Sequence, residues 1–296
     1  MKGAAVPATH ADAFRTLVDY VALTKPRLNM LVVATSAAGF YLGAPTPVNP
    51  VTFAATVLGT TLVAGGAAAL NQVYERRTDA LMERTRLRPL PDGRITPPEA
   101  SVFGLLLSAA GLLLLTLYST WLASLLAFAT LVIYLLVYTP LKLRSPIATL
   151  VGAIPGALPP LIGWTAARGI TMGGISLFLI VFLWQIPHFM AIAWMYRRDY
   201  SAAGFPMLPV IDPSGARAGR QAVGYAAALL PVSLIPTLVG LSGVVYAGVA
   251  VVLGLSMLTL AVQFARARSD ASARWLFFSS LVYLPLIWIV MIADKQ

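Results

Sequence analysis

The sequence contains no cysteine and little charge. Of its 296 residues, 58% are hydrophobic and only 11% are charged, whereas a soluble domain usually carries about 25% charged residues. The lack of cysteine excludes disulfides, thiolate metal sites, a cysteine nucleophile and covalent c-type haem attachment. The shortage of charge excludes a soluble enzyme, a disordered protein and a DNA-binding domain, despite a net charge of +10. No nucleic acid is therefore expected as a partner.

Long hydrophobic runs, with a mean hydropathy of +0.80, indicate a polytopic membrane protein. A helix needs about 20 apolar residues to cross the hydrocarbon core, whereas a β-barrel shows alternating segments of about ten residues. We therefore predict an all-α fold with nine transmembrane helices in one bundle. The predicted spans are 25–43, 51–73, 99–119, 121–140, 147–166, 173–195, 221–240, 244–264 and 273–292.

The span 147–166 is rich in helix-breaking residues. It contains Pro155, Pro159, Pro160 and three glycines. Because proline removes a helical hydrogen bond and clashes with the preceding turn, we expect this helix to be kinked or broken. Irregular backbone at membrane depth is tolerated where it lines a cavity.

Basic residues are distributed very unevenly between the two sides. Of the 21 lysines and arginines, 19 lie on the N-terminal tail and alternate loops, and only Arg168 and Lys295 lie opposite. Cytoplasmic loops are enriched in these residues, so we predict a cytoplasmic N-terminus and an external C-terminus. Residues 1–23 are expected to form a cytoplasmic tail, and 24–296 the membrane domain. The tail has no cleavable signal peptide, which favours a bacterial plasma (inner) membrane. The loop cations also suit contact with anionic membrane lipids.

A polar stripe ends the second span. Asn71, Glu75 and Asp79 lie four residues apart, so they share one helix face over two turns. Such oxygen ligands suit Mg²⁺, which takes one or two carboxylates and fills its other positions with water and substrate phosphates. A helix end with ordinary polar pairs is the alternative. We favour a Mg²⁺ site, because ionisable residues within transmembrane segments are functional by default.

Cations follow the second and fourth spans. Arg84, Arg86 and Arg88 lie within five residues, and arginine binds phosphate oxygens with paired hydrogen bonds. Carboxylates followed by such a cluster predict a diphosphate site; the alternative is a loop whose cations only set orientation. After the fourth span come Tyr138, Thr139, Lys142 and Arg144. Lys142 is a second candidate diphosphate ligand, although the pair of cations could simply stop translocation.

A third polar group begins inside the sixth span with Trp184, Gln185 and His188. His188 lies seven residues before the inner end of the span, or about 10 Å at 1.5 Å per residue. Pro187 and Gln185 favour a lined cavity here. His188 is a candidate haem-iron ligand, proton-transfer group or substrate contact; the alternative is a histidine hydrogen-bonded between helices.

The loop after the sixth span carries Arg197, Arg198, Asp199 and Tyr200. Asp199 is a candidate second metal ligand. The alternative is a loop carboxylate paired with Arg197 or Arg198.

These motifs together resemble the UbiA-type intramembrane prenyltransferases. The first is N-x-x-x-E-x-x-x-D at 71–79 with the arginine cluster that follows it. W-Q-x-P-H-F at 184–189, D-Y-x-x-A-G-x-P-M-L-P at 199–209 and P-P-L-I-G-W at 159–164 are similar to those members that farnesylate haem. The resemblance extends from Thr24 over nearly the whole chain.

The resemblance implies a nine-helix bundle around a central cavity that opens to the cytoplasmic side and laterally to lipid. It also implies Mg²⁺-dependent transfer of a farnesyl group from farnesyl diphosphate to a vinyl group of haem b. Water then adds, giving haem o for terminal oxidases. Haem b is thus a substrate rather than a prosthetic group. Haem a synthase or a terminal oxidase assembly would be the partners.

The motifs and the resemblance together predict the site residues. Catalytic roles are expected for Asn71, Glu75, Asp79, Tyr138 and Lys142. Substrate binding is expected of Arg84, Arg88, Thr139, Arg144, Trp184, His188, Arg197, Arg198 and Tyr200. The predicted metal ligands are Asn71, Glu75, Asp79 and Asp199. Many family members carry a second D-x-x-x-D motif, but here Met195 stands four residues before Asp199.

Two other functions remain alternatives. One is a related prenyltransferase that acts on another aromatic acceptor, such as a quinone precursor. The other is a non-catalytic haem-handling or transport membrane protein. The near absence of charge away from one side and the lack of an evident inverted repeat argue against a transporter.

Overall fold

The computed structural model describes residues 10–296, with side chains described from residue 15 onwards. The secondary structure of these residues is helical, without a strand. The elements are α1 (His10–Leu23), α2 (Pro26–Gly43), α3 (Pro50–Asp79), α4 (Pro97–Tyr118), α5 (Trp121–Val132), η1 (Ile133–Tyr138), α6 (Thr139–Leu141), α7 (Ala148–Ala167), α8 (Met172–Met195), α9 (Arg197–Ala202), α10 (Leu208–Ile211), α11 (Ala216–Val232), α12 (Ile235–Leu238), α13 (Val244–Ala267) and α14 (Asp270–Ala293).

The predicted spans match these helices closely. Within the described part of the chain, eight helices are long and apolar enough to cross a membrane. One of the eight is the continuous run of α5, η1 and α6. The remaining predicted span, 25–43, corresponds to α2, which begins with Pro26 and is 18 residues long. The structure thus confirms the all-helical membrane fold.

The segment predicted as an N-terminal tail contains a helix. Residues 10–23 form α1, which packs against α3. The amide of Gln72 on α3 donates a hydrogen bond of 2.7 Å to the carbonyl of Leu23. This contact fixes the end of α1 beside the predicted metal stripe. Residues 1–9 of the tail lie outside the described residues.

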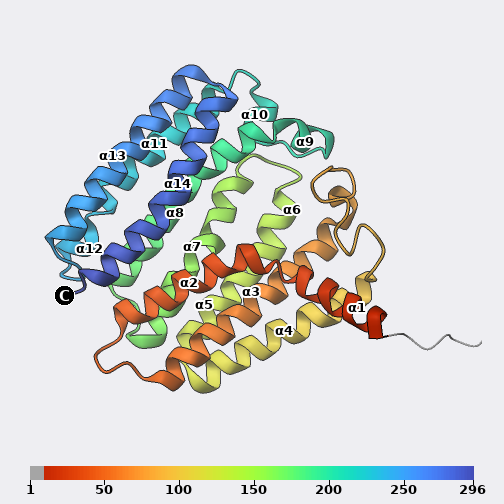
Figure 1. Ribbon diagram of the computed structural model, residues 1–296, viewed down its shortest axis with the longest axis horizontal. Coiled ribbons are helices and arrows are strands. Elements are labelled where there is room, and N and C mark those ends of the chain that lie inside the picture. Colours follow the sequence, from red (N-terminus) through yellow and green to blue (C-terminus); the bar gives the residue numbers. More distant parts are fainter. Residues whose placement is uncertain (1–9) are drawn as a thin grey trace, which may run out of the picture.

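Helix α7 lies in the middle of the bundle, between helices that are distant in sequence (Figure 1). It packs against α2, α5 and α8, and α8 in turn packs against α11 and α14. The expected break is wrong, because α7 is one continuous helix despite Pro155, Pro159 and Pro160; the other expectation, a kink, stays a prediction. Neighbouring helices pack against it on several sides, which is the setting in which proline is tolerated within a membrane helix.

Glycine allows this close approach between α7 and α2. A Cβ atom at Gly163 would collide with the backbone carbonyl of Ser36 on α2. Because backbone cannot move aside as a flexible side chain can, Gly163→Ala should lower the stability of folding by about 1–3 kcal/mol. Unfolding of the detergent-solubilised protein measures this. Gly248→Ala on α13 is the matched control, since its Cβ would meet no atom within 4 Å, and equal stability of the two variants would contradict the packing.

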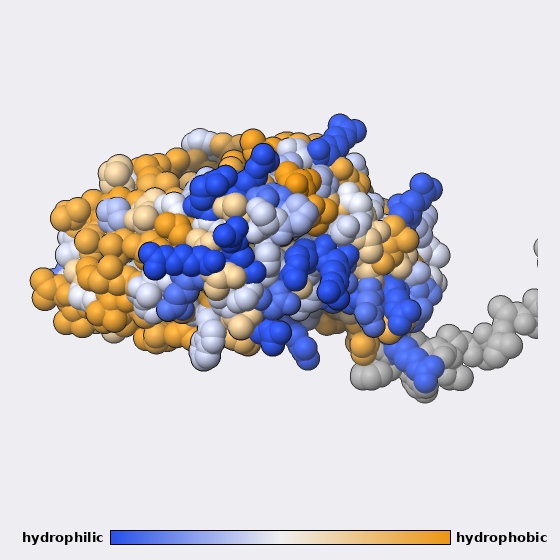
Figure 2. Space-filling view, turned by 90° about the horizontal axis from the view of Figure 1, so that it is seen from above, coloured by the Kyte–Doolittle hydropathy of each residue, from blue (hydrophilic) through white to orange (hydrophobic). Residues whose placement is uncertain are grey.

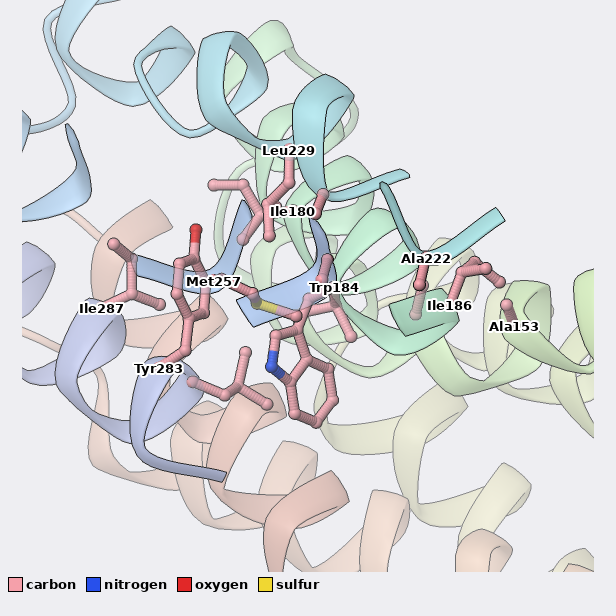
Figure 3. Close-up of a cluster of buried hydrophobic side chains, with 14 of the residues drawn as sticks. Ala153, Ile180, Trp184, Ile186, Ala222, Leu229, Met257, Tyr283 and Ile287 are labelled. Carbon is pink, nitrogen blue, oxygen red and sulfur yellow. The ribbon is translucent and has the colours of Figure 1, made fainter. Parts of the chain in front are cut away.

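The second half of the chain has the larger hydrophobic core. Trp184, Ile180 and Ile186 of α8 pack with residues of α7, α11, α13 and α14 (Figure 3). Tyr283 and Ile287 of α14 are 1% and 0% exposed. Because this core fixes α8 against α14, it determines which α8 side chains remain available to the cavity described below.

Polar and charged side chains gather at one end of the bundle. Figure 2 shows hydrophilic residues over the centre and right of the face seen from above, and mostly hydrophobic residues at its left. Arg168 and Lys295, by contrast, line a pocket together with Leu42 and Gly173, at the end where the C-terminus lies (Figure 1). The loops that the charge count placed on one side therefore share one end, called here the cation-rich end.

Candidate active site

A cavity of about 480 Å³ lies between the two halves of the bundle, towards the cation-rich end. Its walls come from α2, α3, α5, η1, α7 and α8, and small residues such as Ala67, Ala68 and Gly156 leave its space open. Predominantly apolar walls hold a hydrocarbon chain and exclude water. Its polar lining residues are Lys25, Asn29, Arg84, Thr130, Tyr134, Tyr138, Lys142, Thr149, Gln185 and Tyr200.

The predicted stripe on α3 lies next to the cavity rather than in its wall, and it contacts two lining residues, Lys25 and Lys142. Asn71, Glu75 and Asp79 are 2%, 7% and 1% exposed. They share one face because α3 continues as a regular helix through Asp79. The prediction of one stripe is thus confirmed.

Each member of the stripe contacts a cation. The Lys142 ammonium lies 3.1 Å from Glu75 Oε1, and Arg88 Nη1 lies 2.7 Å from Asp79 Oδ2. Although burial would lower the pKa of Lys142, Tyr138 and Glu75 together raise it above its ordinary value, so the ammonium keeps its charge. Each carboxylate of the stripe is therefore paired with a cation.

Lys25 is the third cation of the stripe, and the sequence reasoning did not select it as a site residue. Its ammonium donates to Asn71 Oδ1 at 3.3 Å, and its backbone has φ +48°, in the left-handed region. Residues other than glycine rarely adopt this conformation, and strained positions of this kind cluster at functional sites. Burial, with help from the nearby Arg88, lowers the pKa of Lys25 to about 8. Its position just before Pro26 in T-K-P-R was the available signal.

Lys25→Met should raise the KM for a prenyl diphosphate about tenfold, because one charge-assisted contact is typically worth about 1.5–3 kcal/mol. Arg27→Gln is the matched control, since Arg27 is an exposed cation two residues away. Steady-state kinetics with varied diphosphate measure both variants. Equal KM values in the two variants would remove Lys25 from the site.

The fourth span reaches the stripe through irregular backbone. Residues 133–138 form the π-helix η1, and π-helical turns often occur at functional sites. Tyr134 and Tyr138 stack with their ring centroids 5.5 Å apart, and both line the cavity. Just beyond, Thr139 accepts a 3.1 Å hydrogen bond from the Asn71 amide. The sequence indicated Tyr138 and Thr139 but not the change of helix type.

The loop after α8 covers the same end of the cavity. Tyr200 lines the cavity and packs edge-on against Phe205. The Lys142 ammonium lies 4.6 Å from the Phe205 ring centroid, and Arg84 lies 5.5 Å from the ring centroid of Tyr196. Cations over aromatic faces are attracted to them, so these contacts hold Lys142 and Arg84 beside the cavity.

Other predicted site residues lie elsewhere. Arg197 forms an ion pair with Asp270 of α14 at 2.7 Å, not with Asp199 as the alternative interpretation had it. Arg144 and Arg198 are exposed, and Asp199 is half-buried. Among the described residues, no cluster of three histidine, acidic or cysteine side chains is arranged for a metal ion. The structure therefore does not bring Arg144, Arg197, Arg198 and Asp199 to the cavity wall.

His188 lies beside the cavity on α8. Gln185 and Phe189, which flank it on the helix surface, line the cavity, whereas His188 faces α14. Its ring stacks between those of Trp184 and Phe277, with centroids 5.1 and 5.0 Å away. His188 and Trp184 thus form an aromatic group next to the cavity and do not belong to the stripe of Asn71, Glu75 and Asp79.

The donor set at the stripe fits a magnesium diphosphate. One amide and two carboxylates offer the hard oxygen atoms that Mg²⁺ takes when a substrate phosphate completes its shell. The ion pairs of Glu75 and Asp79 each involve a single carboxylate oxygen. The surrounding cations would bind the remaining phosphate oxygens.

Comparison with known proteins identifies the family. The model of the UbiA prenyltransferase family matches residues 32–282. The chain belongs to the UbiA prenyltransferase family. Like the rest of this family, it is a prenyltransferase enzyme, and the sequence resemblance is confirmed.

A curated UbiA-family relative is similar over almost its whole length. The protoheme IX farnesyltransferase of Solibacter usitatus is 46% identical over 287 residues, covering 94% of this chain and 98% of that protein. The protoheme IX farnesyltransferase of Opitutus terrae is 48% identical over 279 residues, covering 94% of each.

Solved structures share the UbiA fold. A structure of digeranylgeranylglyceryl phosphate synthase matches with a TM-score of 0.82 at 16% identity and covers 95% of this chain and 98% of that one. A UbiA homolog from Archaeoglobus fulgidus, bound to GPP and Mg²⁺, matches with a TM-score of 0.68 at 16% identity, covering 93% and 99%.

Proposed function

We propose that this chain transfers the farnesyl group of farnesyl diphosphate to a vinyl group of haem b, with addition of water, and so produces haem o. The observation that carries the proposal is an apolar cavity lined by Lys25 and Lys142, which contact Asn71 and Glu75 of the stripe beside it. The 46% identity with a protoheme IX farnesyltransferase supports haem b as the acceptor.

Asn71, Glu75 and Asp79 would hold Mg²⁺ together with the diphosphate, as they fit such an ion. The binding of GPP and Mg²⁺ by a protein of the same fold supports this assignment. When bound, Mg²⁺ neutralises charge that develops on the leaving diphosphate.

The residues of this chain then favour cleavage of the bond between farnesyl C1 and oxygen. Lys25, Arg84, Arg88 and Lys142 stabilise the diphosphate as it gains charge. The walls, with the faces of Tyr134 and Tyr138, exclude water and stabilise the allylic cation. The vinyl group supplies the electron pair for the new carbon–carbon bond. Water adds to the resulting cation beside the porphyrin and loses one proton, which leaves a hydroxyethylfarnesyl group.

The acceptor is proposed to bind beside the α8 wall of the cavity, where α8 packs on α14. Trp184 and His188 would contact haem b there, one helix face away from Gln185 and Phe189 of the cavity wall. Thr139 and Tyr200 are proposed as further substrate contacts. Arg144, Arg197 and Arg198 lie at the same end of the bundle and are proposed to attract the anionic substrates over a longer range. Asp199 remains a proposed second metal ligand.

The membrane orientation and the partners are also proposals. The cation-rich end, and with it the site, is proposed to face the cytoplasm from a bacterial plasma membrane, as cytoplasmic loops are enriched in Lys and Arg. Haem o would then pass to haem a synthase or to a terminal oxidase assembly.

Acceptor competition tests the proposed function. Purified protein in lipid nanodiscs is given farnesyl diphosphate, Mg²⁺, haem b and 4-hydroxybenzoate together, and the products are analysed by mass. We expect haem b to gain a farnesyl group and one water. Prenylated hydroxybenzoate with unchanged haem would support the quinone-precursor alternative. Haem bound tightly but recovered unchanged, with no prenylated product, would support a haem-handling protein.

A further inference from the structure

Ser280 of α14 makes two short side-chain contacts. Its hydroxyl lies 2.5 Å from the backbone carbonyl oxygen of Phe277, one turn earlier on the same helix. The same oxygen lies 2.7 Å from Nδ1 of His188 on α8. Ser280 is completely buried, so its side chain links α14 to the histidine away from water.

The two contacts determine where the protons lie. A carbonyl oxygen has no proton, and two oxygens 2.5 Å apart repel unless a proton lies between them. The single proton of Ser280 is therefore donated to the carbonyl of Phe277. Its oxygen can then only accept from His188, so Nδ1 must carry the proton. In neutral imidazole the other nitrogen, Nε2, is then an unprotonated acceptor.

The surroundings of His188 hold the ring in this orientation. Trp184 and Phe277 stack against its two faces, with interplanar angles of 22° and 26°. The Trp184 indole donates to the backbone carbonyl of Ser280 at 2.8 Å, which ties one of these rings to the same turn of α14. Rotation of the imidazole would break this stack as well as the bond to Ser280.

Nε2, on the other edge of the ring, has no hydrogen-bond partner among the described residues and is not completely sealed. Within the described part of the chain, the hydrogen bonding of His188 involves Nδ1 alone. Among the described residues, the fully buried side-chain polar atoms without a hydrogen-bond partner are three tryptophan nitrogens, and Nε2 of His188 is not one of them. An unpaired basic nitrogen within a membrane-spanning helix is unfavourable in lipid, so Nε2 at this position points to a ligand.

We propose that Ser280 is a positioning residue, which fixes His188 as the Nδ1–H tautomer so that Nε2 coordinates the iron of haem b. Histidines that bind metals usually donate their second ring N–H to an oxygen, which fixes ring and tautomer. Gln185 and Phe189, the neighbours of His188 on α8, line the prenyl cavity. Coordination at Nε2 thus anchors the porphyrin at the cavity edge. The inference rests on the proposed function in its choice of ligand, but the tautomer does not depend on it.

Nitrogen NMR tests the tautomer directly. The chain has two histidines, so ¹⁵N-histidine labelling of the His10→Gln variant leaves the ring signals of His188 alone. We expect a pyrrole-type shift for Nδ1 and a pyridine-type shift for Nε2 in the haem-free protein. The reverse assignment, or averaging between two tautomers, would overturn the positioning role even if the enzyme farnesylates haem.

Haem titration tests the ligand. We expect Ser280→Ala to weaken ferric haem b binding about 10- to 100-fold, as removal of such supporting contacts usually does, and to mix the two tautomers in the NMR spectrum. His188→Ala should also lose the spectral signature of a nitrogen axial ligand. Ser279→Ala is the matched control, and the haem-free melting temperature of each variant checks folding. An unchanged haem spectrum in His188→Ala would overturn iron coordination.

The outcomes separate the inference from the proposed function. A nitrogen ligand at His188 without any farnesylated haem would leave this inference standing and contradict the function. Farnesylated haem together with an unchanged haem spectrum in His188→Ala would support the proposed function and overturn this inference.

Discussion

Glu75→Gln is expected to lower kcat/KM for farnesyl diphosphate by about 10²- to 10³-fold, which is typical for the loss of one group that stabilises developing charge. Glutamine keeps the shape of the side chain but removes one of two carboxylates from the proposed Mg²⁺ set. It also leaves the Lys142 ammonium, 3.1 Å from Oε1, without its anion. The Mg²⁺ concentration for half-maximal activity should rise in parallel, as measured by steady-state kinetics over a Mg²⁺ series.

Asp92→Asn is the matched control for Glu75→Gln. Asp92 is an exposed carboxylate in the loop after α3 and pairs only with Arg94 in the described structure, so its loss should change kcat/KM less than twofold. Melting temperatures separate a chemical effect from misfolding. Full activity of Glu75→Gln at saturating Mg²⁺ would contradict the assignment of the stripe as the metal–diphosphate site.

Lys142→Met is expected to lower kcat by about 10²-fold or more, because Lys142 offers a fixed positive charge to the leaving diphosphate. The ammonium is held between Glu75 and the Phe205 ring, so it does not need to be ordered again during the reaction. Methionine keeps the length of the side chain without its charge. Single-turnover measurement of diphosphate release reports the chemical step.

Two further variants, Lys142→Arg and Arg266→Gln, are the controls for Lys142→Met. Arginine restores the charge with a different shape, so we expect partial recovery of the rate. Arg266 is an exposed cation at the same end of the molecule and outside the site, so its replacement should leave kcat unchanged. If Arg266→Gln lowers the rate as much as Lys142→Met, the general field of the cation-rich end, rather than Lys142, drives the chemistry.

The membrane fold could be predicted because each span is one hydrophobic run. Most ends of the predicted spans lie within three residues of a helix end, but α3 continues to Asp79, six residues past 73, and α11 begins at Ala216, five residues before 221. The expected break in α7 was wrong because proline signals the loss of a local hydrogen bond. The sequence does not show that α2 and α8 pack against this helix in the folded protein.

Part of the site could also be predicted. Asn71, Glu75 and Asp79 share a face through local helical periodicity alone. Their contacts with Thr139 and Lys142 join residues 68 and 67 positions apart in the chain, and no local pattern encodes such a distance. The left-handed backbone of Lys25 and the π-helix η1 depend on packing in the same way.

The hydrogen bonding of His188 also depends on a contact that no local sequence pattern encodes. Its position near one end of the sixth span followed from counting residues along a helix. Its partner Ser280 lies 92 positions later, in a helix that carries two adjacent serines, and only the packing of α8 on α14 selects one of them. The tautomer of His188, which decides what its ring can bind, is therefore a property of the fold.

The most direct test of the account measures two products in one sample. Wild-type protein is incubated with haem b, farnesyl diphosphate and Mg²⁺, and both released diphosphate and farnesylated haem are quantified. We expect one diphosphate to be released for each haem that gains a hydroxyethylfarnesyl group, and neither product without Mg²⁺. Diphosphate released while haem b stays unchanged would contradict the central claim that this site joins the two substrates.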